Sequence, residues 1–336
     1  MPYIKFYLTS LEPNLAQTIR SQSIGGYTSN SLVYPETTLS LSVGLYDNSL
    51  SLESYAALSG EDYITINSEI MQVSPINSNT VSIQQRGVND ILNIHAPSDP
   101  VKGGSINKIF NDTFNDDYKQ YRCISVKNIS DNVNPSVNLI AYGMEAYLIQ
   151  GSRTVNTDIK ISIEVPKSQY FEGNSTSWSN ISLVDTSLIG GTLQDNDCKD
   201  AYLKILSGPN SGRNRLISSY DSSTGTFVFY DSLAVDYTSS YNKVIEYEVE
   251  PAPAQRIKTG TESPSFDTEY VSSLGAFTES NPVGINVSSK VDGGNLYSKD
   301  VIYIWLERTI RKGSEFFNAD SCIIGLKYSK KLILTG

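Results

Sequence analysis

Polar and apolar residues alternate in short stretches along this chain, and that alternation limits what it can fold into. Across residues 158–165 the odd positions are all isoleucine or valine, and the even positions are Asp158, Lys160, Ser162 and Glu164. Because successive side chains of a β-strand point to opposite faces, this period of two predicts a strand with one buried face. Residues 243–250 repeat it, with apolar residues at 245, 247 and 249 and glutamates at 246, 248 and 250. We expect those glutamates to face outward and to discourage pairing at a sheet edge.

Further short strands are predicted along the whole chain, whereas helix signals are few. The composition agrees, because 22 tyrosines and a charged fraction of only 18% favour pleated sheets over helical bundles. Clusters of Gly, Pro, Asn and Ser separate the strands, which is typical of β-sandwiches and small barrels. The additional strands are expected at residues 4–8, 63–66, 70–73, 80–85, 122–126, 203–206, 226–230, 301–307 and 321–328. The predicted fold class is therefore all-β.

The chain length predicts more than one packing unit, because 336 residues exceed the roughly 100–200 of a typical domain. Residues 60–104 form one compact block, whose centre reads as a hairpin with an Asn/Ser-rich loop. Residues 166–243 form a second block that contains two turn sequences. The remaining segments, 1–59, 105–165 and 244–336, are predicted to build one discontinuous β-sandwich that carries both blocks as inserted β modules.

Charge and hydropathy exclude two kinds of partner. The chain has 26 Lys+Arg and 36 Asp+Glu, a net charge of −10, and no long basic run, which argues against binding of nucleic-acid phosphates. Its longest apolar stretches, such as residues 301–306, are far shorter than the roughly 20 residues of a membrane-spanning helix, so no membrane insertion is expected. The first residues lack the pattern of a signal peptide and read as a strand, so we expect synthesis and retention in the cytoplasm.

Residues that commonly carry catalysis or bind metals are scarce. Cys123, Cys198 and Cys322 are far apart and odd in number, which suits buried, reduced thiols and not a disulfide framework. His95 is the only histidine, so any nucleophile or zinc site would depend on it, and no metal-ligand spacing surrounds it. We interpret His95 as a structural residue that fixes a loop by hydrogen bonding. We predict no catalytic, cofactor-binding or metal-binding residues.

Two loops have features of ligand sites but are better explained as turns. The glycine-rich residues 208–212 lack the Gly-Lys-Ser/Thr of a phosphate-binding loop, so we expect a hairpin turn with Arg215 bracing a neighbouring carboxylate. Residues 195–200 carry oxygen ligands as in a calcium loop. However, Asp200 stands where glycine would make the turn and Leu206 where a bidentate glutamate is wanted. A solvated loop is therefore expected there.

Carboxylates and aromatic residues leave further interpretations open. Glycoside hydrolysis needs two carboxylates about 5–10 Å apart in a cleft, and the sequence does not place any pair. The candidate carboxylates are Glu61, Asp62, Glu69, Asp116 and Asp117. Tyr303 and Trp305 lie two positions apart in an otherwise apolar strand, which predicts core packing and a strand buried on both faces.

Three sets of motifs resemble parts of tailed-bacteriophage virion proteins. Residues 61–73 (EDYITINSEIMQV), 85–88 (QRGV) and 95–97 (HAP) resemble a small β module that recurs in those proteins. Residues 205–220 (ILSGPNSGRNRLISSY) are similar to a β module inserted into phage tail and fibre proteins. The outer frame resembles a further virion-protein pattern, at residues 5–9, 23–29, 109–111, 121–128 and 303–310.

The resemblance implies a structural component of the virion and does not specify head, neck, tail or baseplate. Our hypothesis is a non-enzymatic protein of the tail, baseplate or neck-fibre apparatus, assembled in the host cytoplasm. It implies other virion proteins and further copies of the chain as partners, in a homo-oligomer. The C-terminal residues 331–335 are expected to pair with a neighbouring sheet edge. The alternatives are a head decoration protein on the capsid, a host-receptor protein that binds surface glycan through Trp178 or Tyr230, and a polysaccharide-cleaving enzyme.

Overall fold

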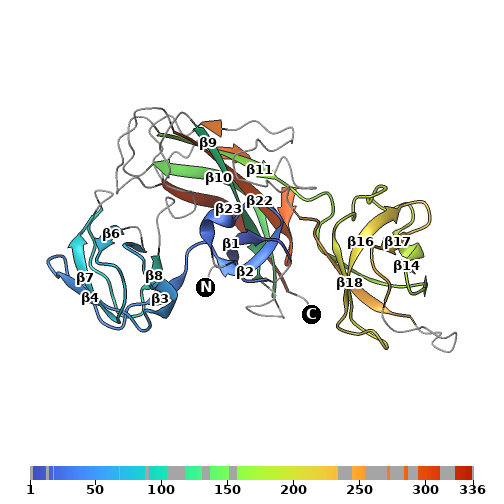
Figure 1. The fold of residues 1–336 in the computed structure, drawn as a ribbon, viewed down its shortest axis with the longest axis horizontal. Helices are drawn as coiled ribbons and strands as arrows, with labels where there is room; N and C mark the ends of the chain where they lie inside the picture. The colour runs from blue at the N-terminus through green and yellow to red at the C-terminus, as the bar shows by residue number, and fades with distance from the viewer. Residues whose placement is uncertain are drawn as a thin grey trace.

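The computed structural model confirms the all-β fold class. It describes residues 3–12, 15–17, 19–67, 69–87, 91–103, 118–130, 137–150, 157–233, 244–253, 271–272, 284–286, 294–310 and 322–334. Strands dominate these residues, and their named helices are single 3₁₀ turns at Arg20–Gln22 (η1), Ala56–Leu58 (η2) and Thr186–Leu188 (η4). None of the described helices is long and apolar enough to cross a membrane. Figure 1 shows a central unit with a smaller unit on either side.

The central unit is a sandwich of two antiparallel sheets. The first has the order β19-β11-β22-β9-β1-β2. Its strands are β1 (Ile4–Ser10), β2 (Tyr27–Leu32), β9 (Tyr118–Asn128), β11 (Thr157–Glu164), β19 (Val271–Ser272) and β22 (Val301–Ile310). The second sheet places β10 (Val137–Gln150) between β23 (Cys322–Leu334) on one side and the short strands β20 (Gly284–Asn286) and β21 (Asn295–Leu296) on the other.

Alternate residues of both sheets form the sandwich core. Ile124, Ile163 and Ile304 project from the first sheet, while Met144 and Ile324 project from the second, and each is at most 5% exposed. Ile161 and Ile163 of the alternating segment therefore face the core, as the period of two predicts. The prediction of a single buried face was wrong, because Ser162 on the opposite face is fully buried as well.

Strand β22 is buried on both faces, which confirms the sequence prediction. Its even-numbered residues face the sandwich core, whereas Tyr303 and Trp305 pack on the opposite face with Tyr121 and Cys123. The buried indole of Trp305 donates its N–H to Glu164 Oε2 at 2.7 Å, so its polar atom is satisfied.

The unit drawn at the left of Figure 1, here called the first module, is a curled sheet of the order β3-β8-β5-β6-β7-β4. Its strands are β3 (Glu36–Thr38), β4 (Ser49–Ser51), β5 (Tyr63–Ile66), β6 (Glu69–Val73), β7 (Thr80–Gln85) and β8 (Pro100–Gly103). A bridge between Leu39 and Leu52 joins the ends of the two edge strands, so the sheet closes on itself around its own core. The sheet begins at Glu36, well before the predicted start of this block at residue 60, because β3 and β4 pair with β8 and β7.

The second module lies on the other side of the sandwich in Figure 1. Its sheet has the order β12-β18-β15-β16-β17-β14-β13 and surrounds a core that includes Leu203, Phe227 and Tyr247. Its strands are β12 (Phe171–Asn174), β13 (Ser177–Trp178), β14 (Ser182–Val184), β15 (Tyr202–Ile205), β16 (Asn214–Asp221), β17 (Thr226–Phe229) and β18 (Glu246–Glu250). The sheet continues past the predicted boundary at residue 243, since β18 pairs with both β12 and β15.

The glutamates of β18 alternate with the core residues 245, 247 and 249, but they are not all exposed and do not protect an edge, so the prediction was wrong for Glu248. Glu248 is only 8% exposed, and β18 lies inside its sheet and not at an edge. Lys204 on the neighbouring strand donates to Glu248 at 2.8 Å, which provides the charge partner that such burial requires.

Candidate interaction site

Glu69 and His95, two candidate residues of the first module, belong to one buried ionic network. Both carboxylate oxygens of Glu69 accept from Arg86, at 2.7 and 2.8 Å, and one also accepts from His95 Nε2 at 2.9 Å. The backbone N–H groups of Gly87 and Asn93 donate to the same carboxylate. Burial opposes ionisation, but these hydrogen bonds outweigh it and lower the pKa of Glu69 to about 2.

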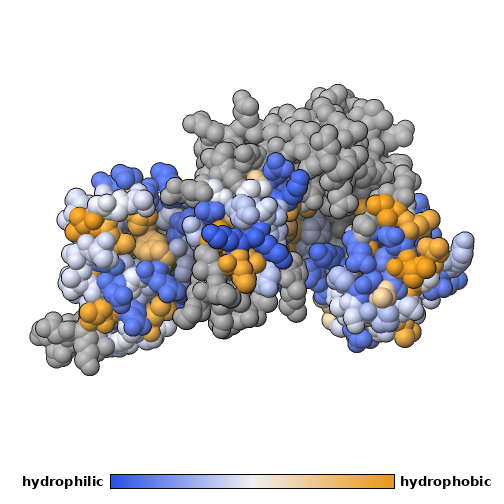
Figure 2. Space-filling model, turned by 180° about the vertical axis from the view of Figure 1, so that it is seen from behind, coloured by the Kyte–Doolittle hydropathy of each residue, from blue (hydrophilic) through white to orange (hydrophobic). Residues whose placement is uncertain are grey.

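This network positions two loops of the first module. His95 forms a backbone bridge with Val43, and Arg86 Nη2 donates to the Asn93 carbonyl at 2.6 Å. His95 thus holds a loop by hydrogen bonding and has no exposed surface. The two loops carry apolar side chains on the outside, including Leu41, Leu92 and Ile94, and Figure 2 shows hydrophobic residues gathered on this module.

The other candidate carboxylates are not brought together as a pair for hydrolysis. Glu61 binds Arg20 at 2.5 Å, whereas Glu69 binds Arg86 in the separate network described above. Asp116 and Asp117 lie outside the described residues. The described residues also contain no group of three or more His, Cys, Asp or Glu side chains arranged to hold a metal ion.

The acidic loop at residues 195–200 uses its carboxylates to fix turns. Asp195 accepts from Ser222, Asp197 accepts from the backbone of Gln194, and Asp200 accepts from the Tyr230 hydroxyl at 3.0 Å. Since each carboxylate serves a different partner, the loop presents no shared position for a cation.

The glycine-rich turn at residues 208–212 connects β15 to β16. The predicted carboxylate partner of Arg215 is wrong, because its guanidinium donates to the backbone carbonyls of Ser232 and Asn214. Both carbonyl oxygens lie within reach of the Arg215 guanidinium. A carboxylate partner would have to come from another part of the fold, and this loop does not bring one close.

Two cysteines are buried and reduced. Cys123 and Cys198 have no exposed surface and form no disulfide. Burial raises the pKa of both thiols, that of Cys198 to about 12, so neither is a thiolate near neutral pH. The side chain of Cys322 lies outside the described residues.

The two aromatic residues proposed for glycan binding have different surroundings. Trp178 is only partly exposed and packs against the core of the second module. Tyr230 is 52% exposed, but its hydroxyl is held by Asp200. Trp178 therefore contributes to the module core, and Tyr230 is the more accessible aromatic surface.

An ionic joint, absent from the sequence predictions, connects the sandwich to the second module. Lys299, in the turn before β22, donates to the Tyr170 hydroxyl at 2.6 Å and to Glu172 at 3.1 Å. The Tyr170 hydroxyl lies within hydrogen-bond distance of both Glu172 and Glu248, so its single proton is shared between two carboxylates. The backbone N–H of Tyr170 donates to Asp300 at 3.1 Å. The joining residues lie well over 100 positions apart, so no local pattern could reveal them.

The charges within this joint support each other. The hydrogen bond from Tyr170 is the main cause that lowers the pKa of Glu172, and Lys299 adds to it. Burial raises the pKa of Tyr170, and its hydrogen bonds to both glutamates raise it further. Burial also raises the pKa of Asp300 to about 6. The joint is therefore a network of proton donors and carboxylates that fixes one unit against another.

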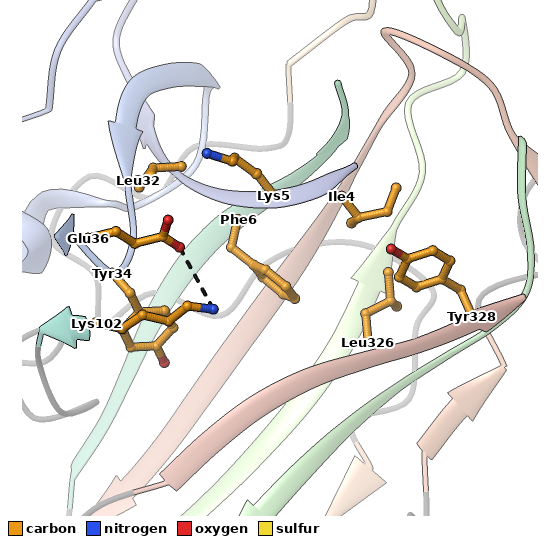
Figure 3. Close-up of a pocket in the computed structure, with 9 residues that line it drawn as sticks. All are labelled: Ile4, Lys5, Phe6, Leu32, Tyr34, Glu36, Lys102, Leu326 and Tyr328. Atoms are coloured by element: carbon orange, nitrogen blue, oxygen red, sulfur yellow. Dashed lines mark ion pairs between the residues drawn. The ribbon is translucent and has the colours of Figure 1, made fainter. Parts of the chain in front are cut away.

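A second feature missed by the sequence predictions is a pocket of about 220 Å³ where the sandwich meets the first module. Apolar and aromatic side chains form most of its wall, and a weak ion pair between Lys102 and Glu36, at 3.7 Å, lies at its edge (Figure 3). The lining residues come from β1, β23, the segment around β2 and β3, and β8: Ile4, Lys5, Phe6, Leu32, Tyr34, Glu36, Lys102, Leu326 and Tyr328.

The same pocket lies beside an open sheet edge. β23 pairs with β10 along one side, from Cys322 opposite Gln150 to Leu334 opposite Val137. No described strand pairs with the other side of β23. Residues 331–335 were predicted to pair with a neighbouring sheet edge. Residues 331–334 instead pair with β10 of the same chain, and their other edge carries no partner among the described strands. An unpaired edge of this length is a template for a further strand.

Comparison of the chain with protein families, with curated proteins and with solved structures found no match. An edge of β23 with which no described strand pairs, and an apolar pocket beside it, form a geometry that can accept an extended segment.

Proposed function

We propose that this chain is a non-enzymatic structural subunit of a tailed-bacteriophage virion, in its tail, baseplate or neck-fibre apparatus. The observation that carries the proposal is the open edge of β23, which runs beside an apolar pocket. The motif resemblance to phage virion modules supports the same assignment. In this function the sandwich supplies contacts to neighbouring subunits, and the modules extend the surface available to them.

The test is mass spectrometry of purified particles from the phage that encodes the chain, with heads and tails separated. The protein should occur in intact particles and in the tail fraction. Its presence in heads alone would favour a decoration protein on the capsid, and its absence from intact particles would refute a virion role.

Substitution is a sharper genetic test than truncation. Removing the residues after Tyr328 would delete the pairing of Ser329 to Leu334 with β10, so it would damage the sandwich of the same chain. Exposed side chains of β23, such as Lys330, can be changed without removing that ladder.

A further inference from the structure

We propose that the edge of β23 with which no described strand pairs, together with the pocket beside it, binds an extended, acidic segment of another polypeptide by strand addition. This inference rests on the proposed assembly function and specifies the chemistry of the partner. Three independent features of the site support it: the backbone edge, the shape of the pocket and the charge around both.

The backbone edge provides the hydrogen-bonding register. β23 is 13 residues long and its pairing with β10 is antiparallel along one side only, within the described part of the chain. Alternate N–H and C=O groups of a strand point to opposite edges, so half of those in β23 face the open side. An extended segment lying about 4.8 Å away would satisfy them.

The pocket provides a place for a side chain of the added strand. Leu326 and Tyr328 of β23 line it on one side, and Phe6 and Tyr34 line it on another (Figure 3). Every second side chain of a strand added next to β23 would point in the same direction as Leu326 and Tyr328, toward this space. Its volume of about 220 Å³ is below the roughly 300–1,000 Å³ of pockets for drug-sized ligands, so an apolar side chain fits it better than a separate small molecule.

The charge around the edge selects an acidic partner. Lys327, Lys330 and Lys331 are exposed on β23, although the chain as a whole carries a net charge of −10. The pocket adds Lys5 and Lys102, of which Lys102 is balanced by Glu36 at 3.7 Å. Lysines on an open edge discourage pairing with a like strand, and they attract a segment that carries carboxylates. The site is therefore complementary to an extended segment in which acidic and apolar residues alternate.

The probe for this inference is a short synthetic peptide that alternates glutamate and valine and has leucine at its centre. Fluorescence anisotropy with the full-length protein should show binding that weakens with salt. Replacing the central leucine by serine should weaken binding at least about tenfold, because the peptide loses the burial of an apolar side chain in the pocket. A peptide with lysine in place of every glutamate should not bind.

Backbone methylation distinguishes strand addition from simple charge attraction. Methylating the N–H groups of alternate residues blocks one edge of the peptide, and methylating the other set blocks the opposite edge. One of the two methylated peptides should lose binding and the other should retain it. Hydrogen exchange of the complex should show slowed amides in β23. Equal binding of both methylated peptides, or protection elsewhere than β23, would overturn the proposal.

A charge reversal in the protein completes the test. Lys330→Glu should lower the affinity for the acidic peptide about five- to tenfold. Lys199→Glu, an equal charge change at an exposed position of the second module, should leave the affinity within about twofold of the original. Absence of binding by the acidic peptide at millimolar concentration would refute strand addition. That outcome would not decide whether the chain is a virion protein, because mass spectrometry of purified particles tests that proposal independently.

Discussion

Replacing Glu69 by glutamine should destabilise the first module by about 3 kcal/mol. The carboxylate has no exposed surface and accepts hydrogen bonds from Arg86, His95 and two backbone N–H groups. Glutamine preserves the shape of the side chain but removes its charge, so Arg86, only 10% exposed, becomes a buried cation without its partner. Removing one member of a buried ion pair costs about 3–5 kcal/mol.

Native-state hydrogen exchange of the amides in β5 and β6 is the appropriate assay. The three units of the chain need not unfold in one transition, so a global denaturation curve would not isolate the first module. A loss of about 3 kcal/mol corresponds to exchange that is roughly 100-fold faster for amides that open with the module. Glu36→Gln is the matched control, since Glu36 is 32% exposed and lies 3.7 Å from Lys102. Its effect should stay below about 0.5 kcal/mol.

Acid titration tests the same network by another route. The pKa of Glu69 is lowered from 4.5 to about 2, so its stabilising contribution is complete above pH 4.5 and is lost as the pH falls toward 2. Exchange in β5 and β6, corrected for intrinsic rates, should therefore accelerate over that interval, and Glu69→Gln should lack this component. Equal effects of the Glu69 and Glu36 variants, or the same acid dependence with and without Glu69, would refute the reasoning.

Three further predictions concern the second module and the sandwich. Gly225→Ala should destabilise the second module by about 3 kcal/mol, since φ is 65° and the new Cβ would clash with a backbone oxygen. Gly212→Ala, with open space around it, should cost about 1 kcal/mol, and native-state hydrogen exchange in β16 and β17 measures both losses; equal losses would contradict this. Cys123 and Cys198 should resist iodoacetamide in the native protein, as judged by peptide mass spectrometry, and modification at the rate of a free thiol would exclude their burial. Lys299→Met should speed proteolysis at residues 165–169 by loosening the joint, and unchanged cleavage would argue against that role.

Local patterns predicted eleven of the 23 strands named among the described residues. Two predicted ranges, 63–66 and 80–85, coincide with β5 and β7, because strong β-formers and flanking turn residues define both ends. The burial of Ile161 and Ile163 likewise follows the pattern read from the sequence. These features depend on neighbours along the chain, so they are visible without knowledge of the fold.

Strand β10 shows how a long strand can be missed. Leu139 and Ala141 are buried at odd positions, but Met144 and Ala146 are buried at even ones. Gly143, with φ of 59°, lies at the change, and the register with β23 shifts between Tyr142 and Glu145. A bulge of this kind inserts one residue and reverses the face on which later side chains lie. The alternation is therefore present on both sides but interrupted, and a search for one continuous period does not find it.

Charged residues depend on partners that the sequence does not place. The three glutamates of β18 have the same local pattern, yet Glu248 alone is buried, because Lys204 and Tyr170 reach it from β15 and from the chain before β12. Lys330 and Lys331 show the same limit in a strand. The sequence predicted that residues 331–335 pair with a neighbouring sheet edge, and the structure pairs residues 330–334 with β10 of the same chain. The charge of these lysines acts at the other edge of β23. We expect it to repel strands that carry lysine and to attract strands that carry carboxylates. In the proposed function, β23 therefore has two roles. Its pairing with β10 stabilises the sandwich, and its other edge selects the segment that binds there.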